Sequence, residues 1–268
     1  MLNDRCSEVE LTENKPMALA SPQQVQEDFY EFPYHYLTSL TPSFSISRNY
    51  DWGINYVSTM EFIVAQLGDL PELKSIIDVG CGDGRLTREL RARFPGVRLA
   101  GVDYSERSIA LANGLNHGSG INFGTADLIN GDMSGDFDAA VLVEVYEHIP
   151  PADGPRFLKG VARLIRPGGT LHLTVPHVNV PVSAHHFRHF NSAVLTAELA
   201  EQFDIVSVLP FERQSAKRRW IQRLLVNRLF VLNHPGLLGK VYKFYMKHLF
   251  HAPSEVHCQR LYVKAIRR

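Results

Sequence analysis

The chain has little cysteine: only Cys6, Cys81 and Cys258 occur among its 268 residues, and they stand far apart. Three scattered cysteines exclude a disulfide-framed scaffold and a zinc site built from cysteine pairs. The sequence also lacks an apolar run of the roughly 18 residues that a membrane-spanning helix needs. Its first residues lack the basic and then apolar pattern of a secretory leader. These absences predict a reduced, cytoplasmic protein.

Net charge is absent too, because 28 basic residues balance 28 acidic ones. The balance hides an asymmetry, since residues 211–268 hold thirteen basic residues and only two acidic ones, Glu212 and Glu255. A basic part of this kind is typical of a surface that meets phosphate groups or an anionic membrane. A solvated helical face explains the same pattern equally well, and the sequence leaves both readings open.

Short apolar runs alternate with helical stretches through the middle of the chain. Parallel strands need helical crossovers, so this rhythm predicts an α/β fold with a doubly wound sheet. Strands are expected at residues 75–79, 99–102, 121–125, 137–143, 170–175, 203–209 and 260–266. Helices are expected at residues 57–68, 86–94, 108–115, 156–165 and 194–201, with further helices in 211–257.

A glycine-rich loop follows the first expected strand and reads DVGCGDG over residues 78–84. Open α/β sheets bind ligands at the carboxyl ends of their strands, and glycine lets the backbone approach a ligand closely. A dinucleotide fingerprint would need a third glycine where this chain has Arg85. Asp78 and Asp83 would also repel a pyrophosphate. The loop therefore disfavours a dehydrogenase and favours a ligand with cationic groups.

Two more aspartates follow the next two expected strands. Asp103 stands 19 residues after Gly84, where an acidic side chain can accept hydrogen bonds from two ribose hydroxyls. Asp127 follows the third strand and can accept a hydrogen bond from an exocyclic amine. Either aspartate alone is also explained as a turn residue. Together with the loop, they favour a nucleoside ligand.

The segment IIDVGCGDG at residues 76–84 resembles the first motif of class I S-adenosylmethionine-dependent methyltransferases. Asp103, Asp127 and residues 137–148 stand where the later motifs of that family do. The resemblance covers about residues 50–210 and the last strand. It implies a Rossmann-like, mostly parallel seven-stranded sheet with an antiparallel last strand, and S-adenosyl-L-methionine as cofactor.

The resemblance also assigns binding roles to the strand ends. Asp78 and the backbone of the glycine loop would hold the methionine moiety. Asp103 and Tyr104 would hold the ribose, and Asp127 with its two neighbours the adenine. The expected cofactor-binding residues are Asp78, Gly80, Cys81, Gly82, Gly84, Asp103, Tyr104, Ala126, Asp127, Leu128 and Glu144.

Candidate catalytic residues follow the fourth and fifth expected strands. His148 closes the segment EVYEH, and histidine is the residue type whose unperturbed pKa, near 6.5, suits a general base at neutral pH. Glu144, at the start of this segment, can neutralise a cationic group of the cofactor. His185, His186 and His189 follow the fifth strand on the same rim, so we expect either His148 or one of these loop imidazoles, with His186 and His189 as the candidates, to act as the base. Pocket scaffolding is the alternative role for each of these residues.

A metal is the alternative to a simple base. Glu144, Glu147 and His148, followed by a loop histidine, also resemble the metal-binding pattern of small-RNA 3′-end 2′-O-methyltransferases. Such a set would suit Mg²⁺ or Mn²⁺. However, a glutamate-histidine pair is common in methyltransferases without a metal, and His189 is followed directly by Phe190 where that family has an intervening residue. We therefore expect no metal ligands.

The chain is expected to divide into five segments. These are a flexible arm at 1–27, an aromatic N-terminal cap at 28–70, a cofactor-binding core at 71–210, a basic helical insertion at 211–257 and a final core strand at 258–268. The aromatic cap either helps to build the acceptor site or packs on the sheet as a hydrophobic strap. The basic insertion lies on an anionic membrane, covers a phosphate-bearing acceptor, or forms a lid or dimer face.

The expected function is O-methylation of a small molecule or glycan intermediate in the cytoplasm, with the inner membrane surface, reached through the basic insertion, as the alternative location. One alternative is a metal-assisted RNA ribose 2′-O-methyltransferase, although no RNA-binding motif accompanies the basic residues. The other alternative is a non-catalytic, cofactor-binding partner subunit. A fold does not fix an acceptor, so its identity, the accepting atom and the oligomeric state stay open.

Overall fold

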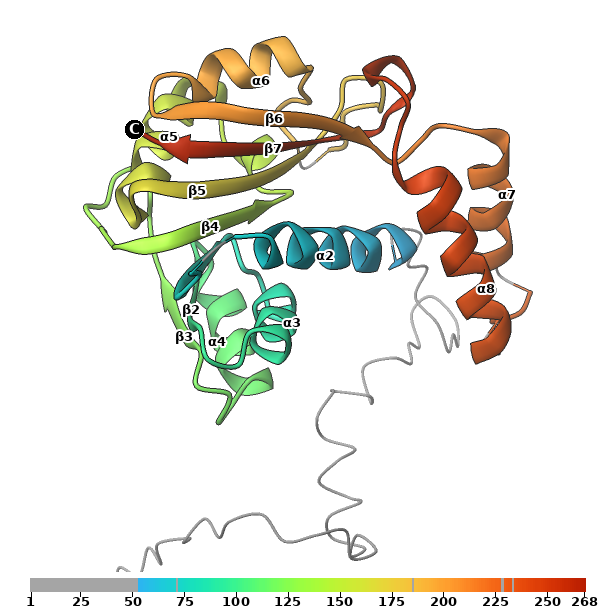
Figure 1. Ribbon diagram of the computed structural model, residues 1–268, viewed down its shortest axis with the longest axis horizontal. Helices are drawn as coiled ribbons and strands as arrows, with labels where there is room; N and C mark the ends of the chain where they lie inside the picture. Colours follow the sequence, from blue (N-terminus) through green and yellow to red (C-terminus); the bar gives the residue numbers. More distant parts are fainter. Residues whose placement is uncertain (1–52, 71, 185, 228, 233) are drawn as a thin grey trace, which may run out of the picture. The chain divides into compact units, whose positions relative to one another are not determined.

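The computed structural model describes residues 53–70, 72–184, 186–227, 229–232 and 234–268 (Figure 1). The expected flexible arm, the part of the aromatic cap up to residue 52, and His185 lie outside the described residues.

The described elements follow the expected alternation of strands and helices. The strands are β1 Ser75–Val79, β2 Arg98–Asp103, β3 Asn122–Thr125, β4 Phe137–Val143, β5 Ile165–Pro176, β6 Phe203–Phe211 and β7 Arg260–Arg267. The longer helices are α2 Gly53–Gly68, α3 Arg85–Arg93, α4 Glu106–Leu115, α5 Gly154–Leu164, α6 Ser192–Leu199, α7 Ala216–Leu225 and α8 Pro235–Tyr245. Short helical turns are η2 Tyr146–His148, η3 Pro151–Asp153, η4 Met246–Phe250 and η5 Glu255–His257.

The seven strands form one sheet in the order β3-β2-β1-β4-β5-β7-β6. β1 to β5 pair in parallel, whereas β7 runs antiparallel to both β5 and β6. The expected seven-stranded, mostly parallel sheet with an antiparallel last strand is therefore confirmed. The strand order reverses between β1 and β4, and sheets of this kind bind ligands at such a reversal.

Helices cover both faces of the sheet, and each face has its own buried cluster. On one face, α5 contributes Phe157, Leu158 and Val161, whose spacing places them on a single side of the helix. On the other face, α2 contributes Ile63 and Leu67. Both layers are visible in Figure 1. The two clusters fix the sheet between the helices and so hold the strand ends in place.

One boundary differs from the sequence expectation. Residues 165–169 were expected to end a helix and form a turn, but β5 already begins at Ile165. Phe137 pairs with Ile165, and the register then shifts before the next pair. Gly168 takes a positive φ of 75° inside this irregular stretch. The Pro-Gly-Gly sequence therefore forms a bulged strand start, which an apolar pattern alone does not reveal.

The segment between β6 and β7 contains α7 and α8 and lies at one end of the sheet (Figure 1). β6 extends to Phe211, so the first residue of the expected insertion belongs to a strand. Across the described ranges, every helix is too short or too polar to cross a membrane.

Candidate active site

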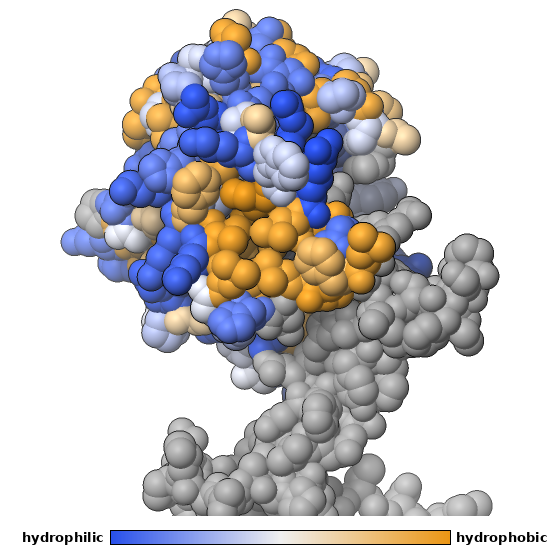
Figure 2. Space-filling model, turned by 90° about the vertical axis from the view of Figure 1, so that its right-hand side faces the viewer, coloured by the Kyte–Doolittle hydropathy of each residue, from blue (hydrophilic) through white to orange (hydrophobic). Residues whose placement is uncertain are grey.

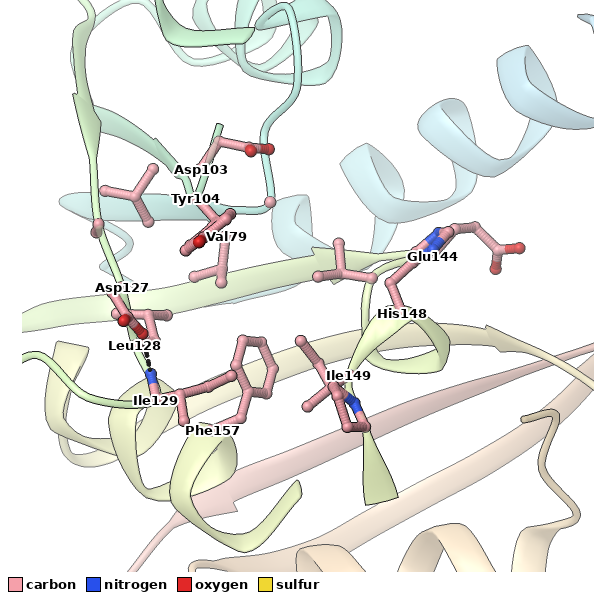
Figure 3. Close-up of a pocket in the computed structure, with 15 residues that line it drawn as sticks. Val79, Asp103, Tyr104, Asp127, Leu128, Ile129, Glu144, His148, Ile149 and Phe157 are labelled. Atoms are coloured by element: carbon pink, nitrogen blue, oxygen red, sulfur yellow. Dashed lines mark hydrogen bonds between the residues drawn. The ribbon is translucent and has the colours of Figure 1, made fainter. Parts of the chain in front are cut away.

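The ends of β1, β2, β3 and β4 border a cavity of about 500 Å³ (Figure 3). Its volume lies within the roughly 300–1,000 Å³ of small-molecule sites. The cavity coincides with the reversal of strand order. Eight of the expected site residues line it, namely Gly80, Asp103, Tyr104, Ala126, Asp127, Leu128, Glu144 and His148.

The glycine loop is held against the end of β2 by its own amide groups. The Gly80 and Cys81 N–H groups donate to the Val102 carbonyl at 2.7 and 3.1 Å. The Gly82 N–H donates to Asp103 Oδ2 at 2.9 Å. Gly80 has a φ of 72°, and a Cβ at this position would overlap with the Val145 side chain. Only glycine therefore fits where the loop meets the cavity.

Asp78 lies beneath the loop instead of lining the cavity. It is buried and accepts a hydrogen bond from Thr87 Oγ1 at 2.7 Å. Burial raises the pKa of Asp78 to about 7, although the hydrogen bond from Thr87 opposes that effect. Cys81, Gly82 and Gly84 are likewise absent from the described lining of this cavity. These expected residues shape and support the loop.

Two acidic side chains stand where a nucleoside was expected. Asp103 accepts hydrogen bonds from the N–H groups of Ser105 and Gly82. Because a carboxylate has about four acceptor positions, Asp103 keeps capacity for two hydroxyl groups. Asp127 accepts from Ile129 and Asn130, and the Asn130 side chain, with the backbone hydrogen bonds, holds the pKa of Asp127 below its usual value. Asp103 and Asp127 therefore each present a hydrogen-bond acceptor at the wall of the cavity.

The apolar wall between these carboxylates was missed by the sequence analysis. It consists of Val79, Val102, Ile129, Val145, Ile149, Pro150 and Phe157. One signal was available, because Phe157 belongs to the apolar face of α5. An apolar slot with acceptors at its edges suits a flat heterocycle joined to a sugar.

Glu144 is held by partners from two strands. Its φ of 55° is left-handed, which is uncommon for a residue other than glycine. Thr174 Oγ1 donates to its Oε1 at 3.1 Å, and Arg260 Nε donates to its Oε2 at 2.7 Å. Arg260 also pairs with the fully buried Glu212, whose φ is again 55°. The sequence analysis did not find this role for Arg260, which is 116 residues from Glu144.

His148 stands between two cavities. It lines the first cavity and also a second one of about 320 Å³. The two cavities share Glu144 and His148. The second is lined by Asn55, Tyr56, Thr59, Val143, Glu144, Glu147, His148, His186 and Arg260. An acceptor in the second cavity would therefore meet the imidazole at the border.

His186 and His189 form a hydrogen-bonded chain. His189 Nδ1 lies 2.8 Å from the Val180 carbonyl oxygen, so this nitrogen carries a proton. The Nε2 of a neutral His189 then accepts from His186 Nδ1 at 2.8 Å. In this arrangement a neutral His186 carries its proton on Nδ1. His186 lines the second cavity, whereas His189 lines neither cavity and instead orients His186.

The histidine loop is fixed to the preceding turn. The Phe187 N–H donates to the Glu147 carbonyl at 2.9 Å. Arg188 donates two hydrogen bonds to Glu198, at 2.6 and 2.8 Å, and Tyr146 donates to the same carboxylate. His186 is thereby held against His148, with the two rings edge to face at 4.7 Å.

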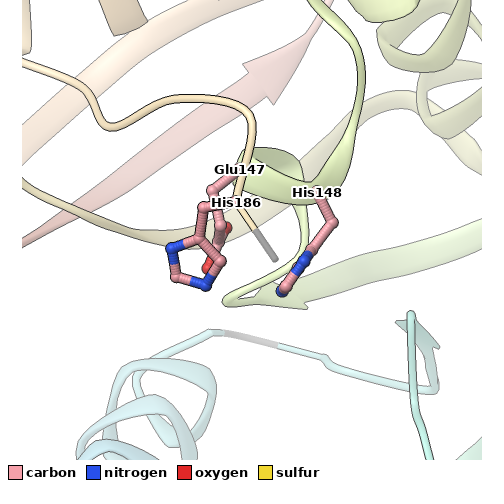
Figure 4. A group of neighbouring side chains, drawn as sticks. All are labelled: Glu147, His148 and His186. Carbon is pink, nitrogen blue, oxygen red and sulfur yellow. The ribbon is translucent and has the colours of Figure 1, made fainter. Parts of the chain in front are cut away.

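Glu147 is buried beside these imidazoles (Figure 4). Within the described part of the chain, neither of its carboxylate oxygens has a hydrogen-bond partner. Ligand atoms of Glu147, His148 and His186 all lie within 4.8 Å of one another. Burial, and then the charge of Glu144, raise the pKa of Glu147. An acid without a donor at this depth is costly, unless a proton or a cation occupies it.

Comparison with known proteins agrees with this geometry. Residues 76–169 match the methyltransferase domain family. A ubiquinone biosynthesis O-methyltransferase of Pseudomonas paraeruginosa is 32% identical over 110 residues, which are 40% of this chain and 46% of that protein. The chain thus spans about half the length of the curated relatives it matches.

Solved structures share the fold at low identity. N-methyltransferase NodS from Bradyrhizobium japonicum is 16% identical with a TM-score of 0.54, over 79% of this chain and 96% of NodS. Phosphoethanolamine N-methyltransferase 2 of Haemonchus contortus, solved with S-adenosyl-L-methionine, is 16% identical with a TM-score of 0.55, over 78% of this chain and 52% of that one. By its domain match and its sheet order, the chain contains a methyltransferase domain at residues 76–169 and has the seven-stranded sheet of the class I methyltransferases, a family that uses S-adenosyl-L-methionine.

Proposed function

We propose that this chain transfers a methyl group from S-adenosylmethionine to a hydroxyl group of a small molecule or glycan intermediate. The observation that carries the proposal is the position of His148 on the border of both cavities. When bound, the cofactor supplies an electrophilic methyl group on a positively charged sulfur. Methyl transfer needs proximity, alignment and a proton acceptor, and the two cavities offer these in one place.

The residues of the first cavity fit this cofactor. Asp103 has acceptor capacity for the ribose hydroxyls, and Asp127 is placed for the adenine amine. The Gly80 backbone and the Glu144 carboxylate border the part of the cavity nearest His148. Carboxylates there would stabilise an ammonium or sulfonium group through opposite charge. This acidic lining supports a cationic donor over a dinucleotide.

His148 is the proposed general base. It would take the proton from the acceptor hydroxyl as the new carbon–oxygen bond forms and the carbon–sulfur bond breaks. His186 lies edge to face with it, and the His189 chain holds His186 in place. A positioned base contributes about 10²- to 10⁴-fold to such a rate.

The test uses His148→Asn and, as a matched control, His117→Asn at an exposed position of the α4–β3 connection. Purified protein is incubated with labelled S-adenosylmethionine and a small-molecule extract, and products are identified by the mass of one added methyl. We expect His148→Asn to lower turnover by about 10²-fold or more with unchanged cofactor affinity. Unchanged turnover would show that His148 is not the general base. Cofactor binding without turnover by the wild-type chain would favour a non-catalytic partner subunit.

A second candidate is metal-assisted methylation of a hydroxyl, including the ribose 2′-hydroxyl of RNA. The observation that favours it is the buried Glu147 carboxylate, which has no hydrogen-bond partner among the described residues and lies beside His148 and His186. These three residues would hold a divalent ion such as Mg²⁺ or Mn²⁺. The bound ion would act as a Lewis acid on the acceptor hydroxyl. In this case His148 is a ligand and not a base.

Calorimetry with Mn²⁺ separates the two candidates. The full chain is titrated with Mn²⁺ beside Glu147→Gln and a control, Glu89→Gln, whose side chain is 40% exposed on α3. Binding that Glu147→Gln alone abolishes, together with turnover that EDTA stops, would establish metal assistance. Full turnover in EDTA without Mn²⁺ binding would remove it. Label transfer to RNA, compared with the small-molecule extract, then identifies the acceptor class.

A further inference from the structure

An exposed apolar patch covers α7, α8 and the segment between them (Figure 2). Its large side chains are Trp220, Leu224, Leu229, Phe230, Val231, Leu237 and Phe244. Leu229 is 92% exposed, Trp220 69% and Val231 67%. A shallow hollow lined by Trp220, Ile221, Val241 and Phe244 lies within the same surface. A soluble chain seldom leaves a contiguous apolar surface of this kind to water unless something binds there.

Positive charge surrounds the apolar patch. Between Glu212 and Glu255 the sequence holds nine basic residues and no acidic one. The exposed basic residues that the structure describes here are Arg213, Lys217, Arg219, Arg223, Lys240, Lys243 and Lys247. Lys217 and Lys240 also line the hollow itself. The surface therefore combines apolar side chains with a single sign of charge.

These helices are attached firmly to the sheet. Arg218 of α7 is buried and pairs with Glu212, which in turn pairs with Arg260 of β7. Tyr245 of α8 is fully buried and donates a hydrogen bond to Asn55 of α2. Each helix therefore has a buried side that packs on the core, and its exposed apolar side chains are additional to that packing. The apolar patch is thus separate from the sides of α7 and α8 that pack on the core.

The charge pattern selects among the partners that an apolar patch can have. A second copy would bring the same basic residues together, with no acidic residue of the 213–254 segment to neutralise them. Nucleic-acid interfaces are polar, and would leave Leu229 and Val231 without an apolar contact. An anionic bilayer surface offers both phosphate groups for the basic residues and acyl chains for the apolar ones.

We propose that the α7–α8 surface binds the face of a membrane that contains anionic lipids. Trp220, Leu229 and Phe230 would enter the boundary between headgroups and acyl chains. The surrounding lysine and arginine side chains would bind the lipid phosphates, an attraction that salt screens. The chain would lie on the membrane and not span it. The proposal does not depend on the methyl acceptor or on the catalytic base.

The test is co-sedimentation of the full chain with phosphatidylcholine vesicles, with and without phosphatidylglycerol. We expect binding to the anionic vesicles only, and a strong loss at high salt. Two variants separate the contributions: Leu229→Ser for the apolar contact and the pair Lys240→Glu with Lys243→Glu for the charge. Each should weaken binding about tenfold or more. The matched controls are Leu111→Ser and Arg107→Glu on α4, where Leu111 is 50% exposed.

Three outcomes would overturn the proposal. The first is equal binding, or none, to both kinds of vesicle. The second is an equal loss in the α4 controls. The third is a dimer in light scattering that Leu229→Ser dissociates, which would assign the apolar patch to a second copy. Because no step requires methyl transfer, failure here leaves the proposed function standing, and the reverse also holds.

Discussion

At the scale of single residues, backbone conformation decides what can stand at the cofactor loop. Gly80 and Gly82 both have a positive φ, of 72° and 56°. A Cβ on Gly80 would overlap with Val145, whereas no described residue other than its chain neighbours lies within 4 Å of a Cβ on Gly82. A side chain at either position would strain the backbone, but at Gly80 it would also overlap with a neighbouring side chain.

Replacing these glycines measures the steric cost directly. Gly80→Ala should lower the free energy of unfolding by about 1–3 kcal/mol more than Gly82→Ala does. The measurement is urea unfolding without cofactor. Adding Val145→Ala to Gly80→Ala should restore part of the loss. Equal losses for the two glycine variants would show that Val145 does not crowd this position.

His172 predicts a pH dependence of stability. It is fully buried, with Nδ1 at 2.8 Å from Tyr262 Oη, and burial lowers its pKa to about 3. The unfolded chain binds a proton below the ordinary histidine pKa of about 6.5, while the folded chain does not. Stability should therefore fall as pH falls from about 6.5, by up to about 1.4 kcal/mol per pH unit. Urea unfolding of His172→Gln should show a weaker fall.

Asp78 predicts the opposite pH dependence of stability. Its folded pKa of about 7 lies above its ordinary value, so the unfolded chain loses this proton first. The Asp78 contribution to stability therefore falls as pH rises from about 4 to about 7. Asp78→Asn should remove that fall. If His172→Gln and Asp78→Asn altered the pH dependence of stability in the same direction, the opposite pKa shifts given for these two buried groups would be wrong.

At the scale of elements, β7 joins the insertion to the active site. Arg260 on β7 pairs with Glu144 at the end of β4 and with Glu212 after β6. Glu212 is fully buried, so loss of Arg260 would leave its carboxylate with the longer ion pair to Arg218, at 3.5 Å. This single arginine also holds two glutamates whose backbone is left-handed.

Arg260→Met should therefore be strongly destabilising. Removing one member of a buried ion pair costs about 3–5 kcal/mol. The control is Arg268→Ala, directly after the same strand, whose pair with Asp204 is exposed and worth about 1 kcal/mol or less. Denaturant unfolding gives both values, and Arg260→Lys gives an intermediate one if the methionine variant does not fold. Similar small losses at both positions would contradict a structural role for Arg260.

Element positions were largely predictable because they depend on local patterns. The apolar runs at Ser75–Val79 and Phe137–Val143 form β1 and β4 with the expected bounds. The early start of β5 was not predictable, because the pairing of Ile165 with Phe137 depends on a distant strand. For the same reason the pattern could not show that Arg260 contacts Glu144, or that the buried Glu147 carboxylate lacks a hydrogen-bond partner within the part of the chain that the structure describes.

At the scale of the whole molecule, strand order came from family resemblance and not from periodicity. Alternation predicts that strands and helices form a doubly wound sheet, but many strand orders satisfy it. Charge was more informative at this scale, since the basic C-terminal part of the sequence corresponds to an exposed surface on α7 and α8. What the sequence could not show is that large apolar side chains remain exposed among these charges.

The central claim is that the cavity at the ends of β1, β2, β3 and β4 binds S-adenosylmethionine through its acidic lining. The most direct test is calorimetric titration of the full chain with S-adenosylhomocysteine, beside Asp103→Ala and an exposed control on α4, Glu106→Ala. The account predicts one ligand per chain, a loss of about tenfold or more in affinity for Asp103→Ala, and no change for Glu106→Ala. The absence of binding by the wild-type chain, or equal affinity in all three proteins, would contradict it.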